Sequence, residues 1–504
     1  MSIKEVWDLF SRGKYSELFA VVEKLTKNDR IEGELLKAHL IHELEGDYAQ
    51  YKTLVDHYLE KESKNTHIQI SARFHKATCY FWESKPLKGD KQLEIGYKLL
   101  RNLPPSEYTD SIVFHEAWYW HLKGTFLLLK GERAQAIESL ENAVTISKKP
   151  GFPVSSMPGA TYNQIGIAYM EDGDYDIAYD MFEKSILTIE EEGNQISASI
   201  PLWNLARIQL MRGDVETALK THERGINIAK TSGWTRLYAG HLQRIAWINY
   251  STGNPQEAIE QFEEVLIKID EGNFPTAYAL ARFSQFQLYL DLQERKKAKE
   301  CANTLSNLAK SSESILIKTL SKMMDALYRK EFNPSFKGKA NAQTNLRELV
   351  ENERVPHHFR IIAMLHLVDL LLLELRVFEE ERILQEILRL SDKIQDFAQS
   401  NVMIPIECEA LILRGKLALI EGSASTAERL LQQALDLAKL KKLKNLETRI
   451  AVEYNHLQTE LAKWMDLIER NAPLSERIEH SRVENYLKQA IKLATLHSDQ
   501  STNK

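Results

Sequence analysis

The chain has 504 residues, of which 43% are hydrophobic and 27% charged, and its formal net charge at pH 7 is -6. This acidic balance argues against a nucleic-acid-binding protein, which normally carries a strong basic excess. The three cysteines, Cys79, Cys301 and Cys408, are scattered and odd in number, so neither a disulfide framework nor a thiolate metal cluster is expected.

The first 110 residues are predicted to form helices with only a weak repeat pattern. Residues 1–8 read as an amphipathic helix that opens with charged side chains, which is unlike a signal peptide. One degenerate unit follows, marked by Leu35, Gly46 and Tyr58. His39 and His42 share a helical face, but histidines in this pattern are more often packing or surface residues than metal ligands. We therefore expect residues 1–110 to be degenerate helical repeats of a cytoplasmic protein.

A residue pattern returns about every 40 positions within residues 111–331 and indicates a regular array. Gly131, Gly173, Gly213 and Gly253 stand at steps of 42, 40 and 40, and each is followed five positions later by alanine. Self-similarity at such a period is typical of solenoids, in which each unit buries its apolar face against its neighbours. Because proline and glycine are scarce, we expect roughly 70% or more α-helix and no sheet.

Each unit reads as two helices joined by a tight turn. In residues 162–185, small and apolar residues fall at spacings of three and four, which is the helical period. Gly173, between the two halves, can take the left-handed conformation that ends a helix. Gly166 and Ala178 are small where two helices would cross closely, and Tyr169 and Phe182 are large enough to fill the remaining gap. These residues predict an antiparallel helix pair stacked on its neighbours.

This pattern resembles the tetratricopeptide repeat. The consensus positions are matched in one unit by Tyr162, Ile165, Gly166, Tyr169, Ala178 and Phe182, and near the C-terminus by Leu411, Gly415, Ala427 and Ala434. The 40-to-42-residue step resembles the long-repeat variety of kinesin light chains, cell-polarity scaffolds, bacterial peptide-sensing regulators and the sensor arm of maltose-regulator-type transcription factors. The resemblance implies an all-α fold, a right-handed superhelical solenoid of stacked antiparallel helix pairs.

The resemblance also implies a partner-binding groove along the first helix of each pair. The family's groove positions fall on Trp118, His121, Asn163, Ile167, Trp203, Arg207, Gln243, Trp247, Tyr250, Phe283 and Gln287. Asn204 lies beside this row, in an Asn-Leu-Ala run like those whose asparagine holds ligand backbone in the long-repeat varieties. Aromatic, arginine and amide side chains together suit a peptide ligand. The alternative is that these aromatic rings pack on facing helices of their own array.

Two breaks interrupt the helical pattern. Residues 149–159 hold three prolines and are predicted to loop out between two units. Residues 332–357 are predicted to be an irregular connection to C-terminal helical repeats at residues 358–444. Within those repeats, the apolar stretch 361–378 contains His366, Asp369, Glu374 and Arg376. It reads as a buried helix, because a membrane span needs about 20 apolar residues.

Residues 445–498 are predicted to form a helical hairpin. Apolar residues recur in steps of three and four from Ile450 to Ile468, the chain turns near Pro473, and the same spacing resumes at Val483. Such a hairpin either caps the open end of the solenoid or forms a homodimer through its apolar seam. The tail, residues 499–504, is expected to be disordered.

A search for catalytic motifs finds no glycine-rich phosphate loop, nucleophile elbow or His-Glu-x-x-His pair in the sequence. Glu453 and His456 have the spacing of a di-iron ligand pair, but such sites need a second pair and two further carboxylates. We therefore expect no catalytic residues, no metal and no cofactor, and a protein that is not an enzyme.

The sequence favours a non-catalytic tetratricopeptide scaffold that binds a peptide or protein partner in its concave groove, with neither nucleic acid nor membrane as a partner. The alternative is a ligand-sensing regulatory protein, resembling the sensor arm of maltose-regulator-type transcription factors, that acts on a separate effector. An extended partner needs an open groove, whereas a small ligand needs a closed pocket.

Overall fold

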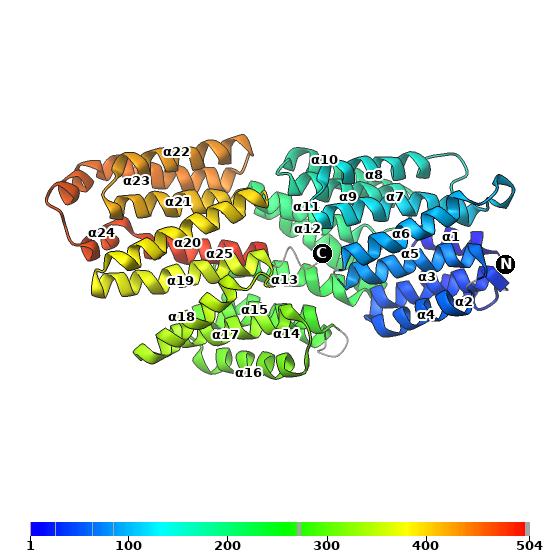
Figure 1. Cartoon of the computed structure of the whole chain (residues 1–504), viewed down its shortest axis with the longest axis horizontal. Helices are drawn as coiled ribbons and strands as arrows, with labels where there is room; N and C mark the ends of the chain where they lie inside the picture. Colours follow the sequence, from blue (N-terminus) through cyan, green and yellow to red (C-terminus); the bar gives the residue numbers. More distant parts are fainter. Residues whose placement is uncertain (1, 26, 63, 84, 270–273, 499–504) are drawn as a thin grey trace. The chain divides into compact units, whose positions relative to one another are not determined.

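The fold is all-α, as the repeat pattern predicts (Figure 1). The computed structural model describes residues 2–25, 27–62, 64–83, 85–269 and 274–498, and the tail predicted to be disordered lies outside them. Helix accounts for 84% of the chain, and no strand occurs within the described ranges. No described helix has the length and apolarity that crossing a membrane requires.

The chain divides into two compact units, which are described separately. Unit 1 comprises Met1–Gln209 and Val215–Ile245, and unit 2 comprises Leu210–Asp214 and Ala246–Asn503. The helices of unit 1 are α1 (Ile3–Ser11), α2 (Tyr15–Val22), α3 (Lys27–Glu45), α4 (Tyr48–Lys61), α5 (Thr66–Trp82), α6 (Pro86–Arg101), the short 3₁₀ helix η1 (Pro105–Glu107), α7 (Asp110–Lys130), α8 (Arg133–Ser147), α9 (Met157–Glu171), α10 (Tyr175–Glu191), α11 (Ser199–Arg212) and α12 (Val215–Ser232). The last three residues of α11 belong to unit 2, and helix α13 (Thr235–Ser251) likewise begins in unit 1 and ends in unit 2.

Consecutive helices pack in pairs, and the repeat glycines separate the two members of a pair. Helix α7 packs against α8 and α9 against α10, and both pairs are closed by a glycine. Gly131 has a φ of 78° and Gly173 a φ of 72°, the left-handed conformation that ends a helix at little cost only in glycine. The predicted two-helix unit is therefore confirmed.

Small residues permit the close helix crossing that the pattern predicts. A Cβ on Gly166 would lie 2.6 Å from the Phe182 ring, and Ala178 is fully buried. Ala218, at the same position one unit later, is also fully buried. The glycine, the alanines and the phenylalanine therefore form the contact between the two helices of a pair.

The two ends of unit 1 meet, although they are far apart in the sequence. The indole N–H of Trp234, just before α13, donates to the carbonyl of Glu43 at the end of α3, over 2.8 Å. Arg236 forms an ion pair with the Glu43 carboxylate at 3.3 Å. Leu44 packs with Trp234 in a small apolar cluster. The N-terminal helices thus contact the start of a helix that follows 191 residues later.

Unit 2 continues the stacked helix pairs to the C-terminus. After the end of α13, its helices are α14 (Pro255–Lys268), α15 (Pro275–Asp291), α16 (Arg295–Ser311), α17 (Ile315–Phe332), α18 (Phe336–Glu351), α19 (His357–Phe378), α20 (Glu381–Ser400), α21 (Ile404–Glu421), α22 (Ala424–Leu440), α23 (Lys444–Glu469), α24 (Leu474–Ser481) and α25 (Val483–Ser498). The apolar stretch 361–378 lies in α19, most of whose residues are buried.

The predicted irregular connection at residues 332–357 is wrong, because most of it is helix α18. Pro334 stands in the short link before this helix, and the Ser335 side chain accepts a hydrogen bond from the backbone N–H of Gly338 at 3.0 Å. A serine in this position starts a helix by satisfying one of its free N–H groups. The proline therefore marks one tight turn between two helices and not a long loop.

The predicted two-armed hairpin at residues 445–498 is also wrong. The segment contains three helices, and the last of them, α25, packs lengthwise against α19 and α21 (Figure 1). The apolar seam of α23 instead faces its own repeats, since α23 packs against α22 and α21. The apolar spacing was correct for each helix, but it did not determine which helices pair.

Candidate partner-binding surface

First helices of successive pairs lie side by side in unit 1 and are joined by polar bonds at the repeat spacing. His121 Nδ1 and Thr161 Oγ1 are 3.0 Å apart and 40 residues apart in sequence. Asn204 Nδ2 donates to Asn163 Oδ1 at 3.0 Å, across 41 residues. Helices α7, α9 and α11 are therefore linked in register through side chains at the predicted groove positions.

Five of the predicted groove residues cluster on α9, α11 and α13 within unit 1. We call them the first-helix face, defined by Asn163, Trp203, Asn204, Arg207 and Gln243. The two asparagines are nearly buried, whereas Trp203, Arg207 and Gln243 are half-buried. The face thus combines an aromatic ring, a guanidinium group and amides at the surface of one repeat array.

The guanidinium group of Arg207 lies close enough to Arg244 of α13 for the two charges to repel. Burial and then this repulsion lower the pKa of Arg207 to about 10, although Glu171 and Tyr175 act in the opposite direction. Arg244 is only 4% exposed. Glu171 is near enough to act on Arg207, so this guanidinium group has an anion within its own chain. The sequence did not identify Arg244, because it stands one position after the predicted groove residue Gln243. The burial of its side chain depends on the packing around it.

Trp203 offers a half-buried apolar ring. Its indole N–H is buried and has no acceptor among the described residues. The N–H is not accessible to a ligand, so the ring is the part of Trp203 that a partner could contact.

Behind the first-helix face, two histidines form a buried neutral pair. His222 Nδ1 and His241 Nδ1 are 2.9 Å apart, and His241 Nε2 lies 3.2 Å from Ser199 Oγ. Burial lowers the pKa of His241 to about 4 and that of His222 well below 6.5, where the nearby Arg244 and His241 add to the effect. One ring must donate its Nδ1–H to the other, so the bond needs at least one neutral ring and is lost when both rings are protonated.

Trp118 and His121, two of the predicted groove residues, also pack against neighbouring side chains. The Trp118 ring is half-buried and stacks on Phe114 with ring centres 5.5 Å apart, and it meets the edge of His75 at 4.9 Å. Burial lowers the pKa of His121 to about 4, so its ring is neutral beside Thr161. Ile167 is half-buried against a small apolar cluster.

The prediction that Trp247 and Phe283 line a groove is wrong for this structure, because both rings are core residues of unit 2. Trp247 is 3% exposed and meets the edge of Phe262, and Phe283 is fully buried against Phe359. The predicted groove phase identifies the face of a helix, but it does not say what covers that face.

Two further predicted positions in unit 2 are covered by the C-terminal helix. The hydroxyl of Tyr250 donates to Asp291, and Lys492 of α25 lies over the Tyr250 ring at 4.7 Å. Gln287 Nε2 donates to Thr495 of α25 at 3.0 Å.

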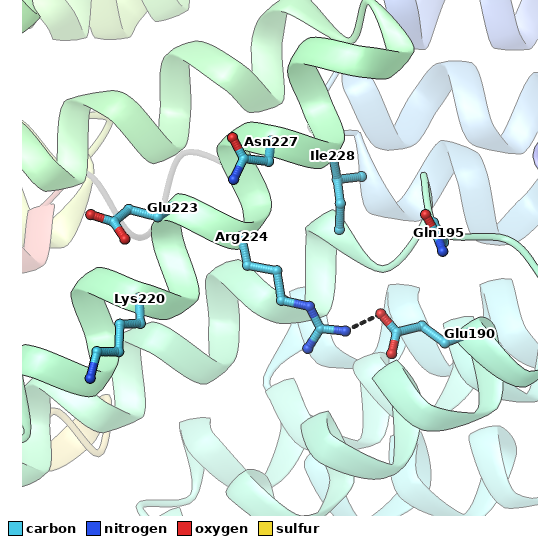
Figure 2. Close-up of a pocket in the computed structure, with 7 residues that line it drawn as sticks. All are labelled: Glu190, Gln195, Lys220, Glu223, Arg224, Asn227 and Ile228. Carbon is cyan, nitrogen blue, oxygen red and sulfur yellow. Dashed lines mark hydrogen bonds and ion pairs between the residues drawn. The ribbon is translucent and has the colours of Figure 1, made fainter.

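A polar pocket of about 380 Å³ opens on unit 1, away from the first-helix face (Figure 2). It lies between α10 and α12, the second helices of their pairs, and the loop before α11. Its lining residues are Glu190, Gln195, Lys220, Glu223, Arg224, Asn227 and Ile228. Both cations of the lining already have anions, since Arg224 forms an ion pair with Glu190 across the pocket and Lys220 forms one with Glu216. Among the described residues, no cluster of three or more potential ligands could hold a metal ion.

Comparisons with known proteins identify the repeats. A family model described as "Tetratricopeptide repeat" matches residues 158–231, and a second model of the same description matches residues 119–150. No curated protein sequence matches the chain.

Several solved structures are similar at low identity. The apo form of the quorum sensor NprR from B. thuringiensis is 17% identical, covers 71% of this chain and 97% of its own, and has a TM-score of 0.49. NprR in complex with its cognate peptide NprX is 16% identical, covers 74% and 100%, and has a TM-score of 0.43. A kinesin light chain with TPR-like repeats from Podosopora anserina is 20% identical, covers 39% and 96%, and has a TM-score of 0.32.

Proposed function

We propose that this chain of tetratricopeptide repeats is a non-catalytic scaffold that binds a peptide or protein partner on the first-helix face of unit 1. The observation that carries the proposal is the Asn204–Asn163 bond at the repeat spacing, beside the half-buried side chains of Trp203 and Arg207 on the same helix as Asn204. The partner would present a carboxylate, at its C-terminus or on an acidic side chain, to the half-buried guanidinium group of Arg207.

The chemistry of the face fits an extended peptide. A guanidinium–carboxylate contact is charge-assisted and geometrically specific. The Trp203 ring supplies apolar area, and Gln243 stands on the next first helix along. Aromatic rings and arginines commonly carry most of the energy of such contacts. Arg207 and the Trp203 ring therefore suit a peptide that has an apolar side chain and ends in a carboxylate.

A catalytic role for the nearby hydroxyl–imidazole contacts is not part of the proposal. Ser199 and His241 are 3.2 Å apart, as in a nucleophile–base pair. However, Ser199 is fully buried and His241 is 1% exposed, so a substrate has no access to them. Thr161, which contacts His121, is fully buried too. These contacts are better explained as links between neighbouring first helices.

The test is direct binding of defined peptides to the purified full chain. An array of peptides would be presented in two forms, with a free C-terminal carboxylate and with a C-terminal amide, and the best binder would be measured by fluorescence anisotropy. We expect the amide form to bind more weakly. Arg207→Gln should reduce affinity roughly 10- to 150-fold, since a lost charge-assisted bond is worth roughly 1.5–3 kcal/mol.

Arg224→Gln is the matched control, because Arg224 is also an arginine of unit 1 but lies at the polar pocket between second helices. It should leave the affinity unchanged. Trp203→Ala should weaken both peptide forms. If Arg207→Gln and Trp203→Ala both bind as the parent does while Arg224→Gln loses binding, the partner surface is the polar pocket and the proposal fails.

A further inference from the structure

Helix α25 lies along the first helices of unit 2, and its position resembles that of a ligand more than that of a cap. A terminal cap covers the last repeat of a solenoid. Helix α25 packs against α21 and α19 and also reaches α15, whose Gln287 bonds Thr495 across 208 residues (Figure 1). One helix thus contacts first helices from several repeats.

Buried polar bonds fix the N-terminal end of this helix. The Tyr486 hydroxyl lies 2.6 Å from both the backbone carbonyl and the carboxylate of Glu409 on α21. Glu409 is 5% exposed and is also held by Arg449, at 2.7 Å. Lys416, two turns further along α21, donates to the carbonyl of Ser481 at the end of α24, over 3.1 Å. Burial and the Glu409 charge raise the pKa of Tyr486 well above 10, so the hydroxyl remains a donor.

A second set of polar contacts fixes the other end. Lys492 Nζ is 3.2 Å from the Asp291 carboxylate and lies over the Tyr250 ring. Thr495 is nearly buried and bonds Gln287. These contacts to α13 and α15 involve the same positions that the sequence predicts for a groove, Tyr250 and Gln287.

Between the two ends, α25 presents an apolar stripe. Val483, Leu487, Ala490 and Ala494 are at most 3% exposed, and they stand at i, i+4, i+7 and i+11. Lys488, on the opposite side, is exposed. This spacing is the pattern by which an amphipathic helix binds a hydrophobic groove.

We propose that the surface of α15, α19 and α21 covered by α25 is a binding site for an amphipathic helix, and that α25 is its internal occupant. We call this surface the α25-binding face, defined by Gln287, Asp291, Glu409 and Lys416. A competing partner would be a helix with the same stripe, a tyrosine at i+3 for Glu409 and a lysine at i+9 for Asp291. The inference concerns unit 2 and does not depend on the partner proposed for unit 1.

The joint before α25 is compatible with release of the helix. Arg482 links α24 to α25 and has a φ of 53°, a left-handed conformation that non-glycine residues adopt at some cost. Tyr486, Lys492 and Thr495 make their contacts through side chains that another helix could carry, whereas the bond from Lys416 goes to the backbone at the end of α24. Displacement would therefore exchange one set of bonds for an equivalent set, and would not leave buried groups unpaired.

The experiment uses a fluorescein-labelled synthetic peptide with the sequence of residues 474–498 and the full chain. In the parent chain the site is occupied in cis, so the peptide should bind weakly. Ala490→Asp places a charge in the apolar stripe of the chain's own helix and should raise affinity for the unaltered peptide at least tenfold. Lys488→Ala, on the exposed side of the same helix, is the matched control and should behave as the parent does.

Equal, weak binding by a folded Ala490→Asp chain, as judged by helical circular dichroism and a cooperative melt, would overturn the proposal. Hydrogen exchange of the parent chain provides a second measurement in case that variant does not fold. The backbone amides of α25 should exchange at least tenfold faster than those of α19, because the occupant leaves while the site stays folded. Exchange as slow as that of α19 would mean that α25 is an inseparable part of the core, and it would equally refute the idea.

Discussion

Replacing Gly124 by alanine is the sharpest test of how the repeats pack. Gly124 lies inside α7, where a Cβ would stand 2.5 Å from the Leu140 Cγ and 2.9 Å from the backbone oxygen of Ala136 in α8. Alanine is intrinsically better than glycine in a helix by about 0.5–1 kcal/mol. Overpacking against a backbone atom that cannot rotate away costs roughly 1–3 kcal/mol. The second effect is larger, so Gly124→Ala should destabilise unit 1 by about 1–2 kcal/mol.

Gly240→Ala is the matched control in the same unit. Gly240 lies within α13 and has open space where the Cβ would be, so the variant should gain roughly 0.5–1 kcal/mol. Gly415, the consensus counterpart of Gly124 in unit 2, has its nearest atom at 3.4 Å and should also tolerate alanine. The assay is calorimetric melting, with the unit 1 transition compared between variants. If Gly124→Ala melts at or above Gly240→Ala, the close crossing of α7 and α8 is absent and the reasoning fails.

Three further predictions follow from burial. Ala178→Leu and Ala218→Leu should each cost about 1–3 kcal/mol by overpacking a helix crossing, and unchanged urea midpoints would contradict this. Trp247→Ala should cost about 3–5 kcal/mol of folding stability, since its ring is core and not a groove anchor. A melting temperature equal to that of the parent chain would show that the ring is not buried. His222 and His241 have folded-state pKa values below the 6.5 of an unfolded chain, so between pH 6.5 and about 4 the unfolded state binds more protons. Stability should therefore be full above pH 6.5 and fall as the pH drops through this window, and a flat melting temperature from pH 7.5 to 4.5 would show that the pair is not buried.

The helix pairs were predictable because local rules determine them. Gly131 and Gly173 end their helices through a conformation that glycine alone adopts cheaply, and Gly166 is small because Phe182 lies against it. These glycines and the residues they contact lie close together in the sequence. The 40-residue repeat can therefore be recognised even where the surface residues differ from one repeat to the next.

The candidate site was only partly predictable, because exposure depends on distant segments. Arg207 and Trp247 stand at equivalent groove positions, yet the first is half-buried and the second is core. The spacing around Leu487 predicted an amphipathic helix but not the surface that receives it, since docking is determined by groups such as Glu409 about 80 residues earlier. Arg244 was not predicted for the same reason: the burial of its side chain is determined by how the repeats pack.

The contact between Trp234 and Glu43 has a consequence for synthesis of the chain. In an ordinary solenoid each repeat can fold as soon as its neighbour has emerged from the ribosome, because contacts are local. Here the end of α3 lacks its final partner until 191 further residues have been made. At about 5–20 residues per second, this delay is roughly 10–40 s. During that interval Leu44 and its neighbours form an exposed apolar end on the nascent chain, which is the kind of surface that chaperones bind.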